Sequence, residues 1–344
     1  MLKACSRSVL ASRQVPATAA GVAARASRRR ATTMAAAGGV PPLVSPQWLA
    51  ERLGSPGVKV LDVSWYMPAM GRDRVADFRA ARIPGARFWD IDGVCAPASD
   101  LPHMLPSEAA FAAAADALGV ANGDTVVLYD GMGAFSSPRA WWTWKVFGHE
   151  NAAVLEGGLP AWKAAGLPLE TDAVTDEAMR AATEAARATG GGPARYKARL
   201  ARDKVKSLSE MRAIIDAGAG AGAAPQVADA RPAGRFRGAD PEPRAGLRGG
   251  HMPGAKSLPF NAMYVDGALA AARFKSPEQL RAAFESAGVD PAAPLVATCG
   301  SGLTACVLAL GAHLATGGGA LPAVYDGSWS EWGAYDDTPI VKDE

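Results

Sequence analysis

The chain has 344 residues, enough for two domains of ordinary size, and its net charge is only +2. That balance gives no argument for nucleic acid or an acidic membrane surface as a partner. No apolar run approaches ~18 residues, so no membrane span is expected. The cysteines are Cys5, Cys95, Cys299 and Cys306. They are too few and too scattered for a disulfide framework, and no Cys/His cluster has metal-ligand spacing.

The N-terminal segment is basic and lacks acids. Residues 1–50 contain no Asp or Glu, and the first acidic residue is Glu51. A secretory signal would have a compact apolar core, whereas Arg among many Ala, Ser and Thr is typical of an organellar transit peptide. We predict a disordered transit peptide over residues 1–40, with the mitochondrion favoured and the chloroplast stroma as the alternative. A disordered basic tail is the other interpretation.

Short apolar strands alternate with helical stretches from residue 43 onward. Strands are expected at residues 58–63, 88–91, 125–129 and 153–155, and helices from residue 48, within 65–82, and at 111–118, 138–147 and 160–165. This alternation predicts an α/β domain over residues 41–171, with a parallel sheet flanked by helices on both faces. A polar helical stretch and a Gly-rich run then predict a linker over residues 172–202.

The pattern of the first domain returns after the linker. The matching stretches are residues 60–62 with 227–229, 82–86 with 251–255, and 154–162 with 324–332. Asp130 follows Gly85, and Cys299 follows Gly254, at the same spacing of 45 residues. Equal spacing between matched motifs indicates an internal duplication, with a second α/β domain over residues 203–344. Asp130 thus stands in the first copy where the second copy has Cys299, so only the second copy has a thiol at this position.

Cys299 follows a buried strand predicted over residues 295–298. Gly300, Ser301 and Gly302 come next, and an apolar helix is predicted from Thr304 onward. The glycines permit a tight loop whose N–H groups point inward, ahead of a helix N-terminus. Both features favour the thiolate form of a cysteine. Cys306 is expected to pack within the following helix, and no role is assigned to Cys95.

The segment Cys299-Gly-Ser-Gly-Leu-Thr-Ala305 resembles the active-site loop of the 3-mercaptopyruvate sulfurtransferases, in the rhodanese superfamily. Leu303 replaces the usual valine, and the resemblance covers almost everything after residue 42. It implies two tandem rhodanese-like domains, an inactive first and a catalytic second. It also implies that Cys299 takes sulfur from 3-mercaptopyruvate as a persulfide, releases pyruvate, and passes the sulfur to a thiol, thioredoxin or cyanide. This chemistry needs no metal or organic cofactor.

Two arginines follow the strand at residues 226–229, at the end where open α/β sheets bind ligands. They are Arg235, in Gly-Arg-Phe-Arg-Gly, and Arg244, which ends Pro-Glu-Pro-Arg. A guanidinium donates two parallel hydrogen bonds to a carboxylate. The resemblance implies that both arginines bind the substrate. The other predicted binding residues are those of the loop, namely Gly300, Gly302, Leu303 and Thr304.

A predicted proton relay comes from both halves. An Asp, a His and a Ser can pass a proton when the Asp orients the His. In the family the proposed relay uses the second Asp of Asp-Ile-Asp, the His of His-Met-Leu-Pro and the Ser after Cys-Gly. The resemblance therefore implies that Asp92, His103 and Ser301 are catalytic. Such a site is complete only when the two domains pack together.

Three other functions remain to be compared. Thiosulfate sulfurtransferases typically place two basic residues directly after the cysteine, whereas this chain has the neutral Gly300 and Ser301 there. This difference favours 3-mercaptopyruvate as the donor and leaves thiosulfate as the alternative. Related cysteine phosphatases need an arginine six residues after the cysteine, but Ala305 stands there. A non-enzymatic rhodanese-like binding or sensor module is typical of domains without the cysteine, whereas this loop is complete.

Overall fold

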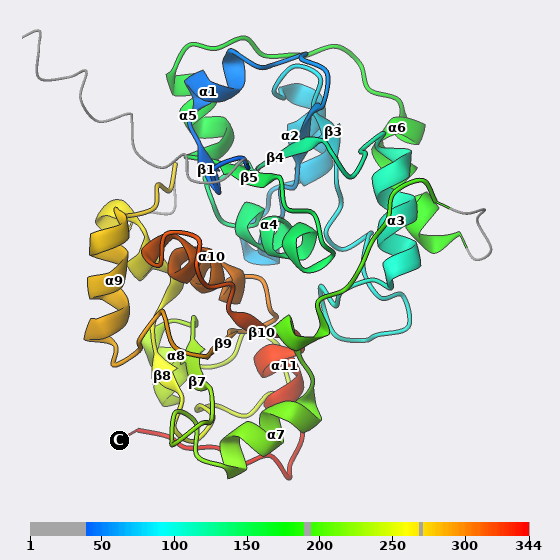
Figure 1. Cartoon of the computed structure of the whole chain (residues 1–344). Coiled ribbons are helices and arrows are strands. Elements are labelled where there is room, and N and C mark those ends of the chain that lie inside the picture. The colour runs from blue at the N-terminus through cyan, green and yellow to red at the C-terminus, as the bar shows by residue number, and fades with distance from the viewer. Residues whose placement is uncertain (1–38, 189–193, 268–270, 344) are drawn as a thin grey trace, which may run out of the picture. The chain divides into compact units, whose positions relative to one another are not determined.

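The computed structural model describes residues 39–188, 194–267 and 271–343, which contain two five-stranded sheets (Figure 1). The first is built from β1 Leu43–Val44, β2 Val58–Asp62, β3 Arg87–Phe88, β4 Thr125–Tyr129 and β5 Ala152–Leu155, and the second from β6 Val205–Lys206, β7 Gln226–Asp229, β8 Lys256–Ser257, β9 Leu295–Thr298 and β10 Ala323–Tyr325. Their orders, β1-β5-β4-β2-β3 and β6-β10-β9-β7-β8, are equivalent, and every strand pair is parallel. The two-copy α/β fold predicted from the sequence is confirmed.

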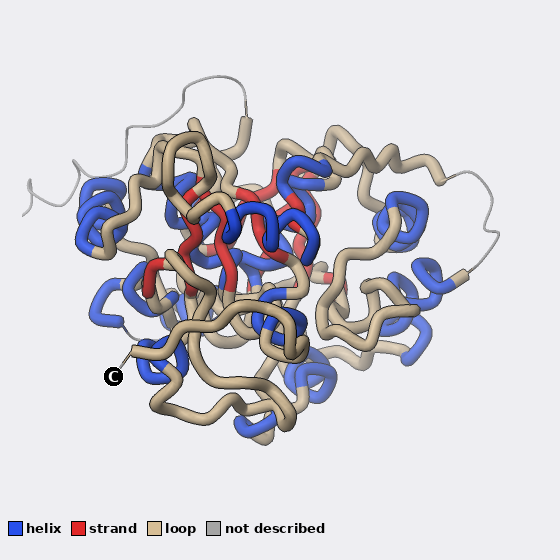
Figure 2. The backbone as a smooth tube through the Cα atoms, turned by 90° about the horizontal axis from the view of Figure 1, so that it is seen from below, coloured by secondary structure: helices blue, strands red, loops and turns tan. Residues whose placement is uncertain are grey.

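Helices surround the strands, which lie in the interior of the view in Figure 2. The helices are α1 Pro46–Ala50, α2 Arg74–Ala80, α3 Glu108–Ala117, α4 Ser137–Val146, α5 Gly158–Ala164, α6 Asp176–Arg187, α7 Leu208–Asp216, α8 Ala233–Arg237, α9 Pro277–Ser286, α10 Ala305–Ala315 and α11 Ser328–Trp332, and the 3-10 turns are η1 Pro68–Met70, η2 Arg202–Lys204, η3 Phe260–Met263 and η4 Val265–Gly267. Serine side chains begin several of them; Ser107, for example, accepts a hydrogen bond from the N–H of Ala110. Such caps satisfy N–H groups that the first helical turn leaves free.

Two almost completely buried helices join the halves. In α4 every residue except Lys145 is buried, and α10 is buried along nearly its whole length. A helix with no polar face, such as α10, must be covered on all sides. Each of the two lies on its own sheet and also packs against the other (Figure 1). One hydrophobic core therefore runs through both halves. Residues 39–344 accordingly form one compact unit.

The strand expected over residues 88–91 is shorter than predicted. β3 pairs with β2 only through Arg87 and Phe88. The chain then turns, because the N–H groups of Gly93 and Val94 donate to the carbonyl of Asp90, and its carboxylate accepts from the N–H of Asp92 at 3.1 Å. This turn lies at the carboxyl end of the sheet and sets the direction of Asp92.

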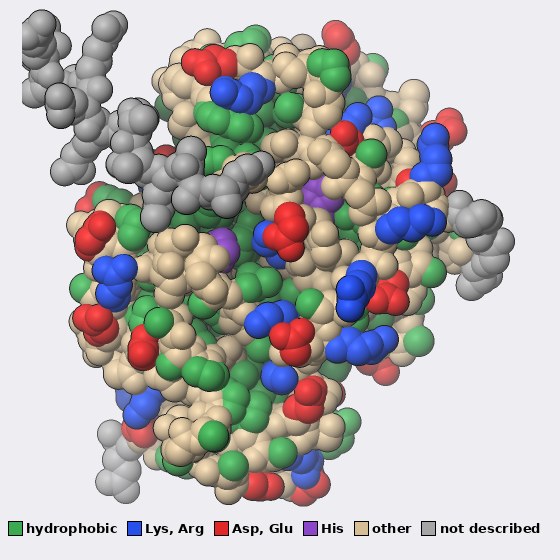
Figure 3. Space-filling model, in the orientation of Figure 1, with side chains coloured by type: hydrophobic (Ala, Val, Ile, Leu, Met, Phe, Trp, Pro, Cys, Tyr) green, Lys and Arg blue, Asp and Glu red, His purple; other side chains and the backbone are tan. Residues whose placement is uncertain are grey.

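The polar helical stretch of the predicted linker is α6, which packs against α3. Met179 and Ala182 are its buried residues. The domain and linker boundaries stay a prediction, and the transit peptide falls on residues 1–38, outside the described part of the chain. No helix among the described residues is long and apolar enough to cross a membrane. On the face seen in Figure 3, acidic and basic side chains are interspersed.

Candidate active site

Cys299 lies directly after β9 and is 2% exposed. The carbonyl oxygens of Cys299 and Gly300 accept hydrogen bonds from the N–H groups of Trp329 and Ser330, at 2.9 and 2.8 Å. By contrast, the N–H groups of residues 300–305 donate no hydrogen bond within the described part of the chain. The loop therefore has its carbonyls anchored by α11 and its N–H groups available to an anion.

In the first copy, the matching loop follows an aspartate and binds its carboxylate. Asp130 stands where the second copy has Cys299, and it is 1% exposed. Its two oxygens accept hydrogen bonds from the N–H groups of Met132, Gly133, Phe135, Ser136 and Ser137 and from the hydroxyl of Ser137, all at 2.7–3.0 Å. The N–H groups at the matching positions 301, 302, 304 and 305 are the free ones. The same loop thus binds an anionic group in the first copy, and after Cys299 in the second copy it leaves these donors without a partner among the described residues.

We expect Asp130→Ala to destabilise the protein strongly, because at least five buried donors lose their acceptor at once. The expected loss is about 3–5 kcal/mol of unfolding free energy, measured by urea denaturation. Asp73→Ala is the matched control, since that exposed carboxylate caps only the N–H groups of Val75 and Ala76. It should cost ~1 kcal/mol. Equal losses in the two variants would contradict the role given to the buried carboxylate.

Ser328 binds the backbone of Cys299 through its hydroxyl group. Its hydroxyl accepts from the N–H of Cys299 at 3.2 Å and donates to the carbonyl of Tyr325 at 2.8 Å. Its backbone φ is +50°, a conformation that favours glycine, and the first copy has Gly158 there with φ +54°. The second copy therefore accepts backbone strain at this position in exchange for a hydroxyl that fixes the start of the Cys299 loop.

Asp92 and His103 are in direct contact. Nδ1 of His103 lies 2.7 Å from Oδ1 of Asp92, and Nε1 of Trp65 donates to Oδ2 at 2.8 Å. Burial raises the pKa of Asp92, but the hydrogen bonds from His103 and Trp65 and the charge of Arg74 outweigh it, so the pKa is lowered overall. An ionised Asp92 holds the proton of His103 on Nδ1.

The other ring nitrogen of His103 has the opposite environment. Nε2 is buried and has no hydrogen-bond partner among the described residues. A buried nitrogen without a partner, opposite an oriented one, is suited to accept a proton from a bound substrate. Ser301, the third member of the predicted relay, is buried, but it makes no hydrogen bond to His103 in the described structure.

Arg235 lies beside the Cys299 loop. A Cβ atom added to Gly300 would lie 3.1 Å from Nη2 of Arg235, so a glycine there leaves room for the guanidinium. Nε and Nη2 of Arg235 donate to Glu242, whose buried carboxylate also accepts from Arg231 at 2.8 Å. Arg244 is half-buried and makes no hydrogen bond or ion pair with any described residue. One predicted arginine is thus placed by an ion pair, and the other keeps its donors free.

The comparisons with known proteins agree with this geometry. Residues 45–165 match the family described as "Rhodanese-like domain". The chain is 41% identical over 305 residues to "Thiosulfate/3-mercaptopyruvate sulfurtransferase 1, mitochondrial" of Arabidopsis thaliana, across 87% of this chain and 78% of that relative. It is 42% identical over 296 residues to "3-mercaptopyruvate sulfurtransferase" of Rattus norvegicus, across 84% of this chain and 91% of that relative.

The chain belongs to the rhodanese-superfamily sulfurtransferases. The crystal structure of SseA from Escherichia coli, titled as a rhodanese fold of 3-mercaptopyruvate sulfotransferases, aligns with a TM-score of 0.67 and 32% identity. The alignment covers 85% of this chain and 100% of the SseA chain. Family membership confirms the resemblance, the tandem fold and the sulfurtransferase activity predicted from the sequence.

Four residues of this sulfurtransferase that contact the candidate site residues or their loops were not singled out from the sequence, namely Glu242, Ser328, Arg139 and Asp326. Glu242 lies inside the Pro-Glu-Pro-Arg motif, next but one to Arg244. The other three stand where the two copies of the repeat differ. A position-by-position comparison of the copies would have found them, because the catalytic copy and its inactive counterpart need different side chains at such places.

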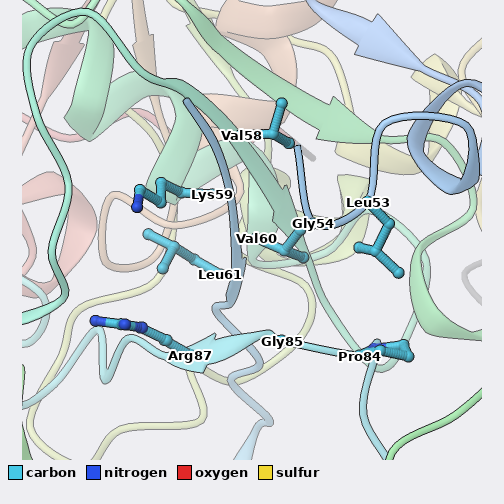
Figure 4. Close-up of a pocket in the computed structure, with 9 residues that line it drawn as sticks. All are labelled: Leu53, Gly54, Val58, Lys59, Val60, Leu61, Pro84, Gly85 and Arg87. Atoms are coloured by element: carbon cyan, nitrogen blue, oxygen red, sulfur yellow. The ribbon is translucent and has the colours of Figure 1, made fainter. Parts of the chain in front are cut away.

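The sulfurtransferase also has a hollow of about 430 Å³ in its first domain, shown in Figure 4. It lies along the amino-terminal part of β2, where the edge strand β3 is too short to cover it. Its lining residues are Leu53, Gly54, Val58, Lys59, Val60, Leu61, Pro84, Gly85 and Arg87. They include no cysteine, histidine or carboxylate, and we assign this hollow no part in sulfur transfer.

Proposed function

We propose that this sulfurtransferase takes sulfur from 3-mercaptopyruvate and carries it as a persulfide on Cys299. The observation that carries the proposal is the Cys299 loop, whose N–H groups are free where Asp130 saturates their counterparts. Donors fixed around a buried sulfur stabilise negative charge on the thiolate and on the persulfide formed from it. The donor is the substrate named for the rat relative, and the Arabidopsis relative carries it together with thiosulfate in its name.

The proposed reaction is balanced without a cofactor. The Cys299 thiolate attacks the thiol sulfur of 3-mercaptopyruvate, and a sulfur–sulfur bond forms as the carbon–sulfur bond breaks. The bonding electrons pass to carbon as the enolate of pyruvate, which takes up the proton that leaves the donor thiol. Arg235 and Arg244 bind the donor's carboxylate in this proposal, and the loop residues Gly300, Gly302, Leu303 and Thr304 surround its sulfur.

Proton movement is assigned to Asp92, His103 and Ser301. With Asp92 ionised and bonded to Nδ1, His103 keeps Nε2 available as a base. Ser301 would connect this nitrogen to the donor once the substrate occupies the site, because hydrogen bonds of apo sites often form only in the complex. Asp92 has a lowered pKa, so it stays charged until the pH falls below the ordinary carboxylate range. Its help to His103 would be lost only there.

The test of the proposed function is a comparison of kcat/KM for 3-mercaptopyruvate and for thiosulfate, with cyanide as the acceptor. A higher value for 3-mercaptopyruvate supports the proposal. A higher value for thiosulfate would replace it with the second candidate, a thiosulfate:cyanide sulfurtransferase, which the attraction of Arg235 and the free N–H groups for a dianion also favours. No turnover of either donor, with no sulfur bound to Cys299, would exclude both.

Donor choice should respond to charge in the loop. We predict that Ser301→Lys shifts the kcat/KM ratio toward thiosulfate by at least about tenfold, because one added cation beside a dianion is worth a few kcal/mol at an effective dielectric near 20. Ser301→Ala is the control, since it removes the same hydroxyl without adding charge. Ser301 suits this test better than Gly300, where a side chain would press against Arg235. Identical ratios in the two variants would show that loop charge does not select the donor.

The acceptor and the compartment are also proposals. We assign small thiols, thioredoxin or cyanide as acceptors. The mitochondrion is favoured because residues 1–50 lack acids and the Arabidopsis relative is named mitochondrial; the chloroplast stroma is the alternative.

Residues 1 to about 38 should be removed after import, because a transit peptide is cleaved from the mature protein. N-terminal sequencing of protein purified from its source should therefore begin near residue 39. A sequence that starts close to Met1 would contradict the predicted transit peptide.

A further inference from the structure

A buried ion pair joins the two domains beside the candidate site. Arg139 lies in the first turn of α4, and Asp326 directly follows β10. Nη2 of Arg139 is 2.6 Å from Oδ1 of Asp326, and the two side chains are only 2% and 4% exposed. Burying two charges costs more than one contact restores, so such a pair persists only where its other donors and acceptors are also satisfied.

Most of the remaining bonds of the pair go to the two loops of the site, and one more joins Nη1 of Arg139 to Sγ of Cys306 in α10 at 4.0 Å. Arg139 Nη2 also donates to the carbonyl of His103, and Nη1 donates to the carbonyl of Gly302 at 3.3 Å. On the acid, Oδ2 of Asp326 accepts from the N–H of Leu105 at 2.8 Å. One ion pair therefore holds the His103 loop of the first domain and the Cys299 loop of the second.

Each loop has a residue with a left-handed backbone conformation beside this pair. His103 has φ +62°, which costs roughly 1–3 kcal/mol for a residue other than glycine. Its carbonyl is the one that Arg139 binds. Gly302 has φ +78°, and an added Cβ would lie 2.8 Å from the carbonyl oxygen of Asp326. Gly302 of the Cys299 loop thus lies close to the backbone of Asp326.

The repeat shows that the pair is specific to this interface. Arg139 matches Leu308 of the second copy by the spacing that matches Asp130 with Cys299, and Asp326 matches Glu156 of the first copy in the alignment of residues 154–162 with 324–332. The copies therefore differ at both members of the pair. The two differing residues, Arg139 and Asp326, contact each other between the Cys299 loop and the His103 loop.

We propose that Arg139 and Asp326 are positioning residues, which hold His103 and Cys299 in register across the domain interface. The first domain then also supports sulfur transfer through Arg139, which fixes the loop of the second domain. This inference depends on the roles proposed above for Cys299 and His103. Neither member of the pair is assigned a contact with the substrate.

The experiment replaces the pair by neutral side chains, as Arg139→Met/Asp326→Asn. This double variant buries no charge, and the amide oxygen at position 326 still accepts from the N–H of Leu105, so the fold should keep a thermal midpoint close to that of the wild type. Because reacting groups displaced by about 1 Å lose roughly 100-fold in rate, we expect kcat to fall roughly 10- to 100-fold. KM should change less than about threefold, because the arginines assigned to the donor are untouched.

A second ion pair of the first domain provides the matched control. Arg82 Nη2 lies 2.8 Å from Glu170, which also accepts from the N–H of Gly85 at 2.7 Å. Arg82→Met/Glu170→Gln therefore makes the same chemical change away from both loops and should leave kcat unchanged. Arg139→Lys retains the charge but cannot reproduce the fork that spans His103 and Gly302, so it should also lower kcat. Wild-type kcat in both Arg139 variants, or equal losses in the control, would overturn the proposal.

Sulfur loading separates this inference from the proposed function. Intact mass after addition of 3-mercaptopyruvate, without acceptor, reports the persulfide on Cys299 directly. A wild-type protein that gains no sulfur would refute the proposed function. A wild type that loads, together with an Arg139→Met/Asp326→Asn variant that loads equally fast, would refute only the positioning role. We expect fast loading in the wild type and slow loading in the folded double variant.

Discussion

Cys299→Ser should abolish sulfur transfer while leaving the fold and donor binding intact. A hydroxyl oxygen at this position cannot form a persulfide, and its pKa is far too high for it to act as the nucleophile at neutral pH. Intact mass after incubation with 3-mercaptopyruvate should show the gain of one sulfur atom in the wild type and none in the variant. Turnover should fall to the level of the reaction without enzyme.

Cys306→Ser is the control for this variant. Cys306 lies in α10 and is buried, and burial raises the pKa of its thiol to about 12, so it stays protonated. The first copy already has Ser137 at the matching position. We expect Cys306→Ser to load sulfur as the wild type does. Turnover by Cys299→Ser, or loss of loading in Cys306→Ser alone, would move the nucleophile away from Cys299.

Arg235→Ala and Arg244→Ala should each lower kcat/KM for 3-mercaptopyruvate by roughly 10- to 150-fold. A lost hydrogen bond to a charged group is worth about 1.5–3 kcal/mol, and each arginine is assigned to the donor's carboxylate. The measurement is steady-state kinetics with 3-mercaptopyruvate. Arg235→Ala also leaves the buried Glu242 with one partner fewer, so a thermal midpoint should be recorded beside the kinetics.

Arg237→Ala is the matched control, because Arg237 lies in the same helix as Arg235 but is exposed. It should retain the kinetics of the wild type. If Arg235→Ala and Arg244→Ala also retain them, the carboxylate of the donor binds elsewhere.

The duplication could be predicted because it depends on local patterns. Buried parallel strands are apolar runs such as Thr125–Tyr129, and turns between elements need Gly or Pro. Two copies of one fold therefore show the same sequence pattern at the same spacing. The strands that the sequence did not predict were missed for an equally local reason. The edge strands β1 and β6 are only two residues long, too short for any periodicity, and they exist because β5 and β10 offer a free edge.

The sequence by itself determined which copy can transfer sulfur, since the identity of Cys299 against Asp130 decides it through chemistry alone. The tertiary structure decided what holds that thiol. Ser328, Glu242 and the Arg139–Asp326 pair act through side-chain direction and packing, and the two members of that pair are 187 positions apart in the chain. No local pattern encodes such a contact. It arises because two buried helices, α4 and α10, each cover their own sheet and also pack against each other, and this brings the two loops together.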